Sequence, residues 1–216
     1  MANYVVELKC LEKYLPRGTK VDQFEGMAFV SLVAFTFDKS RVVGMPIPGH
    51  RRFEEVNLRF YVVHENSPAV RAVTFISEIV PKKAIAFVAN RLFSERYRSM
   101  PMSSAINENK VCYSWGNELE NRFEGQVADR LKLPDANSVE EFITEHYVGY
   151  SRSENGALEY RVEHPQWECC LCESFDISVN FGNIYGEDFR FLGESEPYNV
   201  LYTEGSRVTA TFPRRV

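Results

Sequence analysis

The stretch from Phe53 to Val63 holds the residues of this sequence best suited to bind or transform a small molecule. Read as a β-strand, its period of two places four polar residues on one face: Glu55, Asn57, Arg59 and Tyr61. Residues two apart on a strand face lie about 6.6 Å apart, so Glu55 and Arg59 are separated by about 13 Å, the length of a small ligand. An acid, an amide, a guanidinium and a phenol together can bind polar groups of either charge. A polar face that only meets solvent fits the same alternation.

The sequence around this stretch predicts the strands that pack against it. Its other face is apolar and should pack on the core, through Val56, Leu58, Phe60 and Val62. Met27 to Phe37 is almost entirely apolar, which is typical of a strand covered on both sides. After a turn at residues 64–68, Val70 to Val80 returns as the second strand of a hairpin.

Pro81-Lys82-Lys83 is the second candidate for chemistry. Pro81 suits the first position of a helix, and the apolar spacing after it predicts an amphipathic helix over about residues 82–97. Two lysines at the positive end of a helix are each disfavoured by roughly 0.3–1 kcal/mol, and Val80 is a poor cap. Such a start fits an amine whose pKa is lowered for reaction. It also fits two solvated lysines at the end of a strand.

The rest of the chain reads mainly as strands. Ser138 and Glu141 form a capping box that opens a short helix, and Asn155-Gly156 indicates a hairpin. Residues 199–212, interrupted at Glu204-Gly205, predict a C-terminal hairpin. With about ten strands and two or three helices, we expect residues 1–216 to form a single α+β, mainly antiparallel domain, sandwich-like or barrel-like.

Composition excludes several classes of protein. The 216 residues carry a formal net charge of -5 and are 44% hydrophobic, so a sizeable core is expected and a nucleic-acid partner is not. No apolar run approaches the ~18 residues of a membrane span, and the N-terminus does not resemble a signal peptide. Five cysteines without framework spacing favour the cytoplasm. The oligomeric state stays open, and a homo-oligomer is compatible with the sequence.

No metal or cofactor is predicted. Cys169-Cys170-Leu171-Cys172 invites a metal-site interpretation, but alternation lets at most Cys170 and Cys172 converge, and buried thiols are favoured. The sequence has no Gly-x-Gly-x-x-Gly, phosphate loop or Gly-x-Ser-x-Gly motif. His164, with Trp167 close behind it, is the best-placed histidine if a base is needed, although such a pair is more often a packing unit at a strand end.

Several separated motifs resemble a known bacterial family. They are the stretch Gly49 to Tyr61 (Gly-x3-Phe-x-Glu-x-Asn-x-Arg-x-Tyr), the Phe75-Ile76 strand before a long helix, residues 142–147, Glu163 to Trp167 and Glu204-Gly205-Ser206. In this order they look like the YqjF-like family, which has no established function and is placed in the acetoacetate-decarboxylase-like superfamily. The resemblance implies a curved antiparallel sheet that closes into a cone or barrel around a central cavity.

The resemblance also implies roles for single residues. In acetoacetate decarboxylase a Pro-Lys-Lys segment supplies an imine-forming lysine and a second lysine that lowers its pKa, because an adjacent cation disfavours the charged amine. By similarity Lys82 is the nucleophile, Lys83 its electrostatic neighbour and Glu55 a pocket acid. Glu78 lies three residues before Pro81, where the decarboxylase has its glutamate five before the proline.

Two functions follow from these candidates, and a third interpretation stays open. In the first, a polar central cavity binds a small oxo- or carboxylic-acid-like ligand without catalysis. In the second, the protein is a Schiff-base-forming decarboxylase, lyase or aldolase-dehydratase-like enzyme that uses Lys82. The third is a structural or interaction protein with a filled barrel. The predicted ligand-binding residues are Asn57, Arg59, Tyr61, Glu78, His164 and Trp167, and the predicted catalytic residues are Lys82, Lys83 and Glu55.

Overall fold

The structure, a computed structural model, describes residues 1–39, 41–42, 45–46, 52–127, 130–153 and 156–216. Gly49, where the family-like pattern begins, lies outside the described residues, as does Asn155 of the predicted hairpin turn. No helix in the described ranges is long and apolar enough to cross a membrane.

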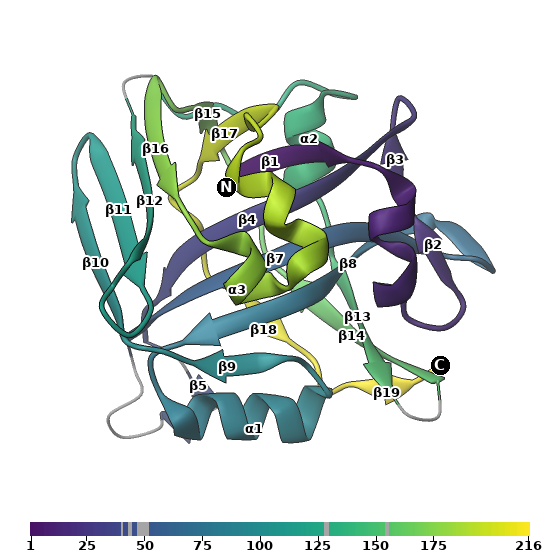
Figure 1. The fold of residues 1–216 in the computed structure, drawn as a ribbon. Coiled ribbons are helices and arrows are strands. Elements are labelled where there is room, and N and C mark those ends of the chain that lie inside the picture. Colours follow the sequence, from purple (N-terminus) through teal and green to yellow (C-terminus); the bar gives the residue numbers. More distant parts are fainter. Residues whose placement is uncertain (40, 43–44, 47–51, 128–129, 154–155) are drawn as a thin grey trace.

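Three long strands form the centre of the molecule. They are β4 (Met27–Phe37), β7 (Phe53–His64) and β8 (Ser67–Val80), and β7 pairs antiparallel with both of the others. Figure 1 shows them side by side across the middle of the view. The predicted strand and hairpin are therefore confirmed, with β8 beginning three residues earlier than expected.

A β-bulge interrupts the pairing of β7 with β8. Leu58 lies opposite Ser77, but the next residue, Arg59, lies opposite Phe75, so Ile76 is the extra residue of β8. An extra residue shifts the alternation of the strand by one. As a result Glu78 and Phe75 share the polar face of β7, whereas Ile76 packs into the core on the other face.

Most other strands extend this sheet. Its path runs β15-β17-β1-β4-β7-β8-β13-β14-β18, and β2, β3, β9 and β19 pair at its sides, which makes 13 strands among the described residues. The added strands are β1 (Ala2–Val6), β2 (Thr19–Val21), β3 (Gln23–Phe24), β9 (Tyr97–Ser99), β13 (Val148–Ser153), β14 (Gly156–Glu163), β15 (Cys170–Leu171), β17 (Asn199–Tyr202), β18 (Thr209–Ala210) and β19 (Arg214–Arg215).

Two smaller sheets complete the β-structure. A four-stranded antiparallel sheet at the left of Figure 1 contains β10 (Met102–Asn107), β11 (Lys110–Trp115), β12 (Asn121–Gln126) and β16 (Ser174–Ser178). A third sheet is the pair β5 (Arg41–Val42) and β6 (Met45–Pro46).

The prediction that the sheet closes into a cone or barrel is wrong. The path begins at β15 and ends at β18, and no pairing between described residues joins these two ends. Each end strand is only two residues long, so neither offers a ladder of hydrogen bonds that could seal the sheet. The predicted C-terminal hairpin is also wrong, because β17 pairs with β1 and β15 while β18 pairs with β14.

The helices are short, and the N-termini of α1 and α2 differ in whether a side chain caps them. α2 (Val139–Thr144) begins as its capping box predicts, with the Ser138 hydroxyl accepting from the backbone N–H of Glu141. α1 (Lys83–Phe93) has no side-chain cap at Lys82 and ends at Ser94 in the left-handed conformation. The remaining helices are α3 (Phe181–Tyr185) and the 3₁₀ segments η1 (Leu8–Cys10), η2 (Glu12–Tyr14) and η3 (Glu187–Gly193).

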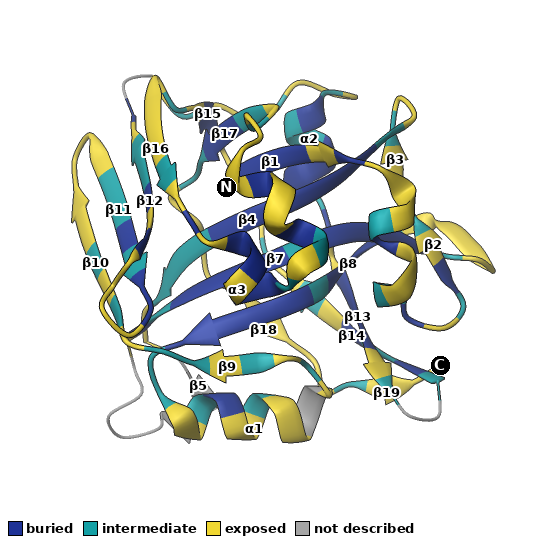
Figure 2. Cartoon of the chain, viewed as in Figure 1, coloured by how far each residue is buried: buried dark blue, intermediate teal, exposed yellow. Residues whose placement is uncertain are grey.

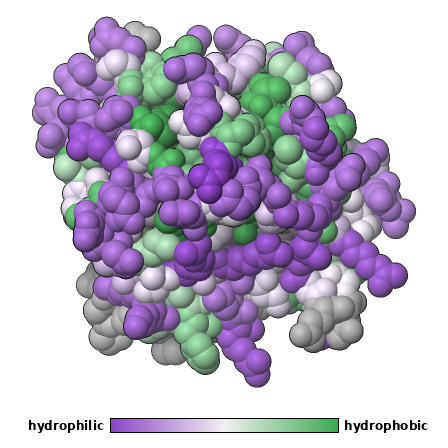
Figure 3. All heavy atoms as spheres, in the orientation of Figure 1, coloured by the Kyte–Doolittle hydropathy of each residue, from purple (hydrophilic) through white to green (hydrophobic). Residues whose placement is uncertain are grey.

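Both faces of the central sheet are covered. The apolar face of β7 packs under α3 and η3, where Leu58 and Phe60 are fully buried together with Phe181 and Phe189. Figure 2 shows the middle of the central strands as mostly buried, with buried and exposed segments alternating along α3 and η3 above them. A second apolar cluster, with Phe29, Tyr61 and Phe142 among its members, covers part of the polar face. Hydrophilic side chains occupy most of the outer surface in the same view (Figure 3).

Candidate functional site

The polar face of β7 points into the protein. Glu55 and Asn57 are 2% and 3% exposed, Tyr61 is fully buried and Arg59 is half-buried. The solvated-face alternative is therefore excluded for Glu55, Asn57 and Tyr61. Burying this many polar groups costs free energy unless they find partners, so their hydrogen bonds decide what the face can do.

Three carboxyl groups meet at the Phe53 end of β7, and we call Glu55, Glu78 and Glu95 the acid cluster. Glu78 lies on β8 next to Asn57, its partner across the strands, and beside Tyr97 of the parallel strand β9. The Asn57 amide donates to Glu55 Oε1 at 3.0 Å, and the Tyr97 hydroxyl donates to Glu55 Oε2 at 3.0 Å.

Glu95 joins this cluster from the chain just before β9. The Tyr160 hydroxyl donates to Glu95 Oε1 at 3.0 Å. Tyr160 reaches it across Gly149, its partner on β13, where an added Cβ would come within 2.2 Å of the Tyr160 ring. A glycine at 149 therefore makes room for the ring that supports the cluster.

Burial keeps protons on the acid cluster. It raises the pKa of Glu55 to about 7, against hydrogen bonds from Asn57 and Tyr97 that act the other way. It raises the pKa of Glu95 to about 8 and the pKa of Glu78 well above its usual value, with the neighbouring carboxylates adding to the rise at Glu78. A protonated carboxyl donates as well as accepts, so near neutral pH the cluster can give or take a proton.

The other end of the polar face is cationic. Arg59 Nη2 donates to the carbonyl of Ile143 at 3.4 Å, and its guanidinium carbon lies 5.8 Å from the centre of the Tyr61 ring. His146, just after α2, lies against Tyr61 with ring centres 4.7 Å apart. Burial lowers the pKa of His146 well below its usual value, and the charges of Arg59 and Arg71 lower it further.

Five polar atoms on this face have no hydrogen-bond partner among the described residues. They are buried atoms of both ends: Asn57 Oδ1, Glu78 Oε2, Arg59 Nε and both ring nitrogens of His146. Each such group costs about 1–3 kcal/mol if it stays unpaired. These five are among the eight buried side-chain polar atoms without a partner in the described part of the chain.

The predicted lysines lie at the start of α1. Lys82 is half-buried at the N-cap in an extended conformation, and Lys83 is exposed as the first residue of the helix. The two amines therefore have different surroundings. An imine-forming role for Lys82, with Lys83 tuning it, stays a prediction.

His164 and Trp167 lie elsewhere. The rings of Tyr147, His164 and Trp167 stack in that order, with centres 4.7 Å and 4.3 Å apart, and Trp167 Nε1 donates to the Ser206 hydroxyl at 2.8 Å. This stacking matches the second interpretation of His164 and Trp167 in the sequence, a packing unit at the end of a strand. A role for either residue in ligand binding stays a prediction.

Four residues of the site were missed in the sequence: Glu95, Tyr97, His146 and Tyr160. They follow a helix or lie in distant strands, and nothing in their local pattern relates them to Glu55. Gly149 was the one local signal for this site, because a glycine between Val148 and Tyr150 in an apolar strand indicates that another group approaches the backbone closely. No cluster of three or more potential metal ligands occurs in the described ranges.

Comparison with known proteins places the chain in a family. The DUF2071 family model, described as an uncharacterized conserved protein, matches residues 1–207. The chain belongs to this family. It is also 26% identical over 201 residues to the uncharacterized protein YqjF of Bacillus subtilis, covering 91% of this chain and 81% of YqjF. The YqjF-like resemblance read from the motifs is thus confirmed.

Solved structures show the same fold at low sequence identity. An acetoacetate decarboxylase-like enzyme from Sphingomonas wittichii aligns with a TM-score of 0.67 at 13% identity, covering 100% of this chain and 88% of its own. Acetoacetate decarboxylase from Legionella pneumophila gives 0.65 at 11% identity, covering 100% and 82%. The enduracididine biosynthesis enzyme MppR complexed with pyruvate gives 0.57 at 12% identity, covering 96% and 86%. The fold is acetoacetate-decarboxylase-like.

Proposed function

We propose that this protein binds a small oxo acid on the polar face of β7, between Arg59 and the acid cluster. The supporting observation is the set of buried polar atoms at Asn57, Arg59, Glu78 and His146 that find no hydrogen-bond partner within the described ranges. A ligand that pairs with these atoms removes their unfavourable burial, and this gain contributes to its affinity. The five free cysteines favour the cytoplasm as the place where this happens.

The two ends of the face fit the two ends of an oxo acid. A guanidinium with a free N–H is a preferred partner for a carboxylate. A protonated carboxyl at Glu78 can donate to the oxo oxygen, because burial raises the pKa of that group. Asn57 and Arg59 are two residues apart on β7, a separation of roughly 6.6 Å that suits a ligand of three or four carbons. The structural neighbour MppR was solved with pyruvate, an acid of this kind.

A Schiff-base enzyme that uses Lys82 is the second candidate. The half-buried Lys82 lies two residues after the end of β8, the strand that carries Glu78, and acetoacetate decarboxylases are among the structural neighbours. In such a reaction the neutral amine attacks the oxo carbon, and water leaves as the imine forms. A proton from the acid cluster would help that water to leave.

Isothermal titration calorimetry with pyruvate as the ligand tests the proposal. We expect saturable binding by the unchanged protein and at least about tenfold weaker binding by Arg59→Gln, because a charge-assisted hydrogen bond is lost. Arg122→Gln is the matched control, because Arg122 pairs with Glu124 on the outer four-stranded sheet. Equal affinity in Arg59→Gln and Arg122→Gln would show that the polar face of β7 does not bind pyruvate.

Borohydride reduction separates the two candidates. Reduction in the presence of pyruvate, followed by peptide mass spectrometry, should label Lys82 if an imine forms. Binding without a label supports the non-covalent function. A label that persists in Lys82→Arg would place the imine on another lysine and remove the second candidate.

A further inference from the structure

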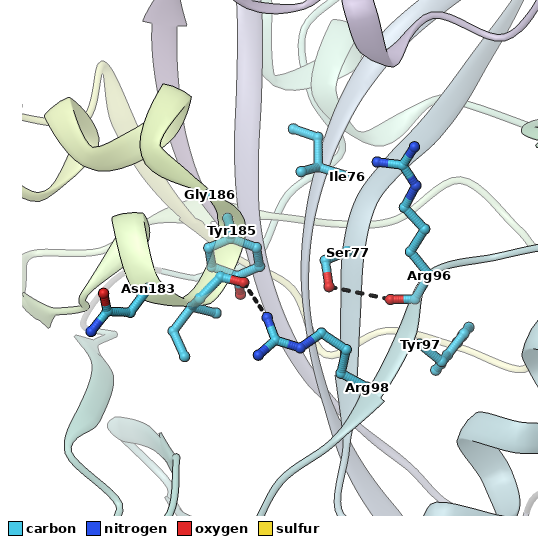
Figure 4. Close-up of a pocket in the computed structure, with 9 residues that line it drawn as sticks. Ile76, Ser77, Arg96, Tyr97, Arg98, Asn183, Tyr185 and Gly186 are labelled. Carbon is cyan, nitrogen blue, oxygen red and sulfur yellow. Dashed lines mark hydrogen bonds between the residues drawn. The ribbon is translucent and has the colours of Figure 1, made fainter.

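An open cleft of about 380 Å³ lies between β9, the end of β8 and α3 (Figure 4). Residues 76–77, 96–98 and 183–186 line it. We propose that this cleft binds the phosphate or carboxylate group of a small molecule. Its volume falls within the range of about 300–1,000 Å³ that is usual for small-ligand pockets.

Two arginines supply the positive charge. Arg98 lies in the middle of β9, Arg96 directly precedes this strand, and both residues line the cleft. Arg98 Nη1 donates to the Ile184 carbonyl at 2.6 Å, which holds the guanidinium at the wall of the cleft (Figure 4). A guanidinium has five N–H donors, so this contact leaves donors available.

Neither arginine has an acidic partner in the cleft. No Asp or Glu lines it, and neither arginine takes part in an ion pair between described residues. Arg96 lies 5.6 Å from the Tyr14 ring centre and acts weakly on Glu95, opposing the burial that raises the pKa of that residue to about 8. In a chain of net charge -5, such a donor-rich spot favours an anion.

A buried hydroxyl at the cleft is also unpaired. Tyr185 is 5% exposed, and its hydroxyl has no hydrogen-bond partner among the described residues. Burial raises the pKa of Tyr185 and the charge of Arg98 opposes the rise, so the hydroxyl is a protonated donor near Arg98. An oxyanion that contacts Arg98 would give this hydroxyl an acceptor, because phosphate and carboxylate oxygens accept several hydrogen bonds.

The cleft and the polar face of β7 lie on different sides of β9 and share only Tyr97 among the residues that line the cleft. Tyr97 donates to Glu55, so Arg98, the next residue of β9, points to the opposite side of this strand. The cleft therefore stands without the proposed function, and its test uses no residue of the polar face.

Isothermal titration with inorganic phosphate and, separately, with malonate tests the cleft. We expect saturable binding of at least one of them, weakened about tenfold or more by Arg98→Gln and by several fold in Tyr185→Phe. Arg122→Gln should bind as the unchanged protein does. Circular dichroism confirms folding, and Arg96→Gln provides a second variant if loss of the Ile184 contact unfolds Arg98→Gln.

Each result decides the proposal. Selective binding of phosphate identifies a phosphorylated ligand, and selective binding of malonate identifies a carboxylated one. The proposal is overturned if neither anion saturates, or if Arg122→Gln weakens binding as much as the cleft variants do.

Discussion

At the Phe53 end of the polar face of β7, Glu55 accepts hydrogen bonds from both Asn57 and Tyr97. At the other end, Arg59 Nε and both nitrogens of His146 are buried with no hydrogen-bond partner in the part of the chain that the structure describes. The acid end meets most of the cost of burial by keeping protons and accepting hydrogen bonds, with Asn57 Oδ1 and Glu78 Oε2 left unpartnered among the described residues. The arginine end meets it only in part, through aromatic contacts and the hydrogen bond from Arg59 Nη2 to the Ile143 carbonyl. A ligand therefore has more to contribute at the arginine end, whereas changes of pH act mainly on the acid end.

The largest expected effect is the pH dependence of stability that the acid end causes. The folded protein raises the pKa of Glu55 from 4.5 to about 7, which favours the protonated form. Stability from this group is therefore full below pH 4.5 and is lost as the pH rises through about 7. Such a shift corresponds to roughly 3 kcal/mol. In urea denaturation between pH 5 and pH 8.5, Glu55→Gln should flatten the fall in the free energy of unfolding.

Glu54→Gln is the control for this prediction. Glu54 lies on the opposite face of β7 and accepts a hydrogen bond from the Ser104 hydroxyl at 2.8 Å. It should keep the pH slope of the unchanged protein. The same slope in all three proteins would contradict the account of the acid end.

A second effect distinguishes the arginine end. His146→Phe replaces a ring with two unpaired nitrogens by an apolar ring between Tyr61 and Phe142. We expect the ligand-free protein to gain about 1–2 kcal/mol in thermal unfolding, because unpaired buried polar groups are removed. Destabilisation by a similar amount would mean that ordered water already satisfies the imidazole.

A smaller effect sharpens the role of the tyrosines. Tyr97→Phe removes the hydrogen bond that lowers the pKa of Glu55, so that pKa should rise. We expect a loss of about 1 kcal/mol of stability at pH 8, where Glu55 is ionised, and a smaller loss at pH 5. Tyr113→Phe, which loses a hydrogen bond to Thr36 instead, should cost the same at both pH values.

The smallest effect concerns the start of α1. Lys83 is exposed in the first helical turn, where a cation is disfavoured. Lys83→Ala should stabilise the protein by a few tenths of a kcal/mol, and Lys83→Glu by about 0.5–1 kcal/mol, in chemical denaturation. Destabilisation by both variants would indicate that the Lys83 amine makes a contact that stabilises the fold.

The sequence alone determined the central strands and the two faces of β7. Alternation assigned Leu58 and Phe60 to the core and Glu55 and Arg59 to one polar face, because side chains of a strand point alternately to its two sides. The Ser138 cap could also be predicted from the sequence, because its hydrogen bond joins two residues that are only three positions apart. Local geometry is enough to predict features of this kind.

Only the tertiary structure decided the composition of the site and the shape of the sheet. Glu95 and Tyr160 reach Glu78 through contacts between segments far apart in the chain, and the bulge at Ile76 shifts which residues of β8 face them. The open ends of the sheet depend on how few residues of β15 and β18 find partners. Periodicity carries no information on such long-range pairing, because it records the direction of a side chain and not its neighbour in space.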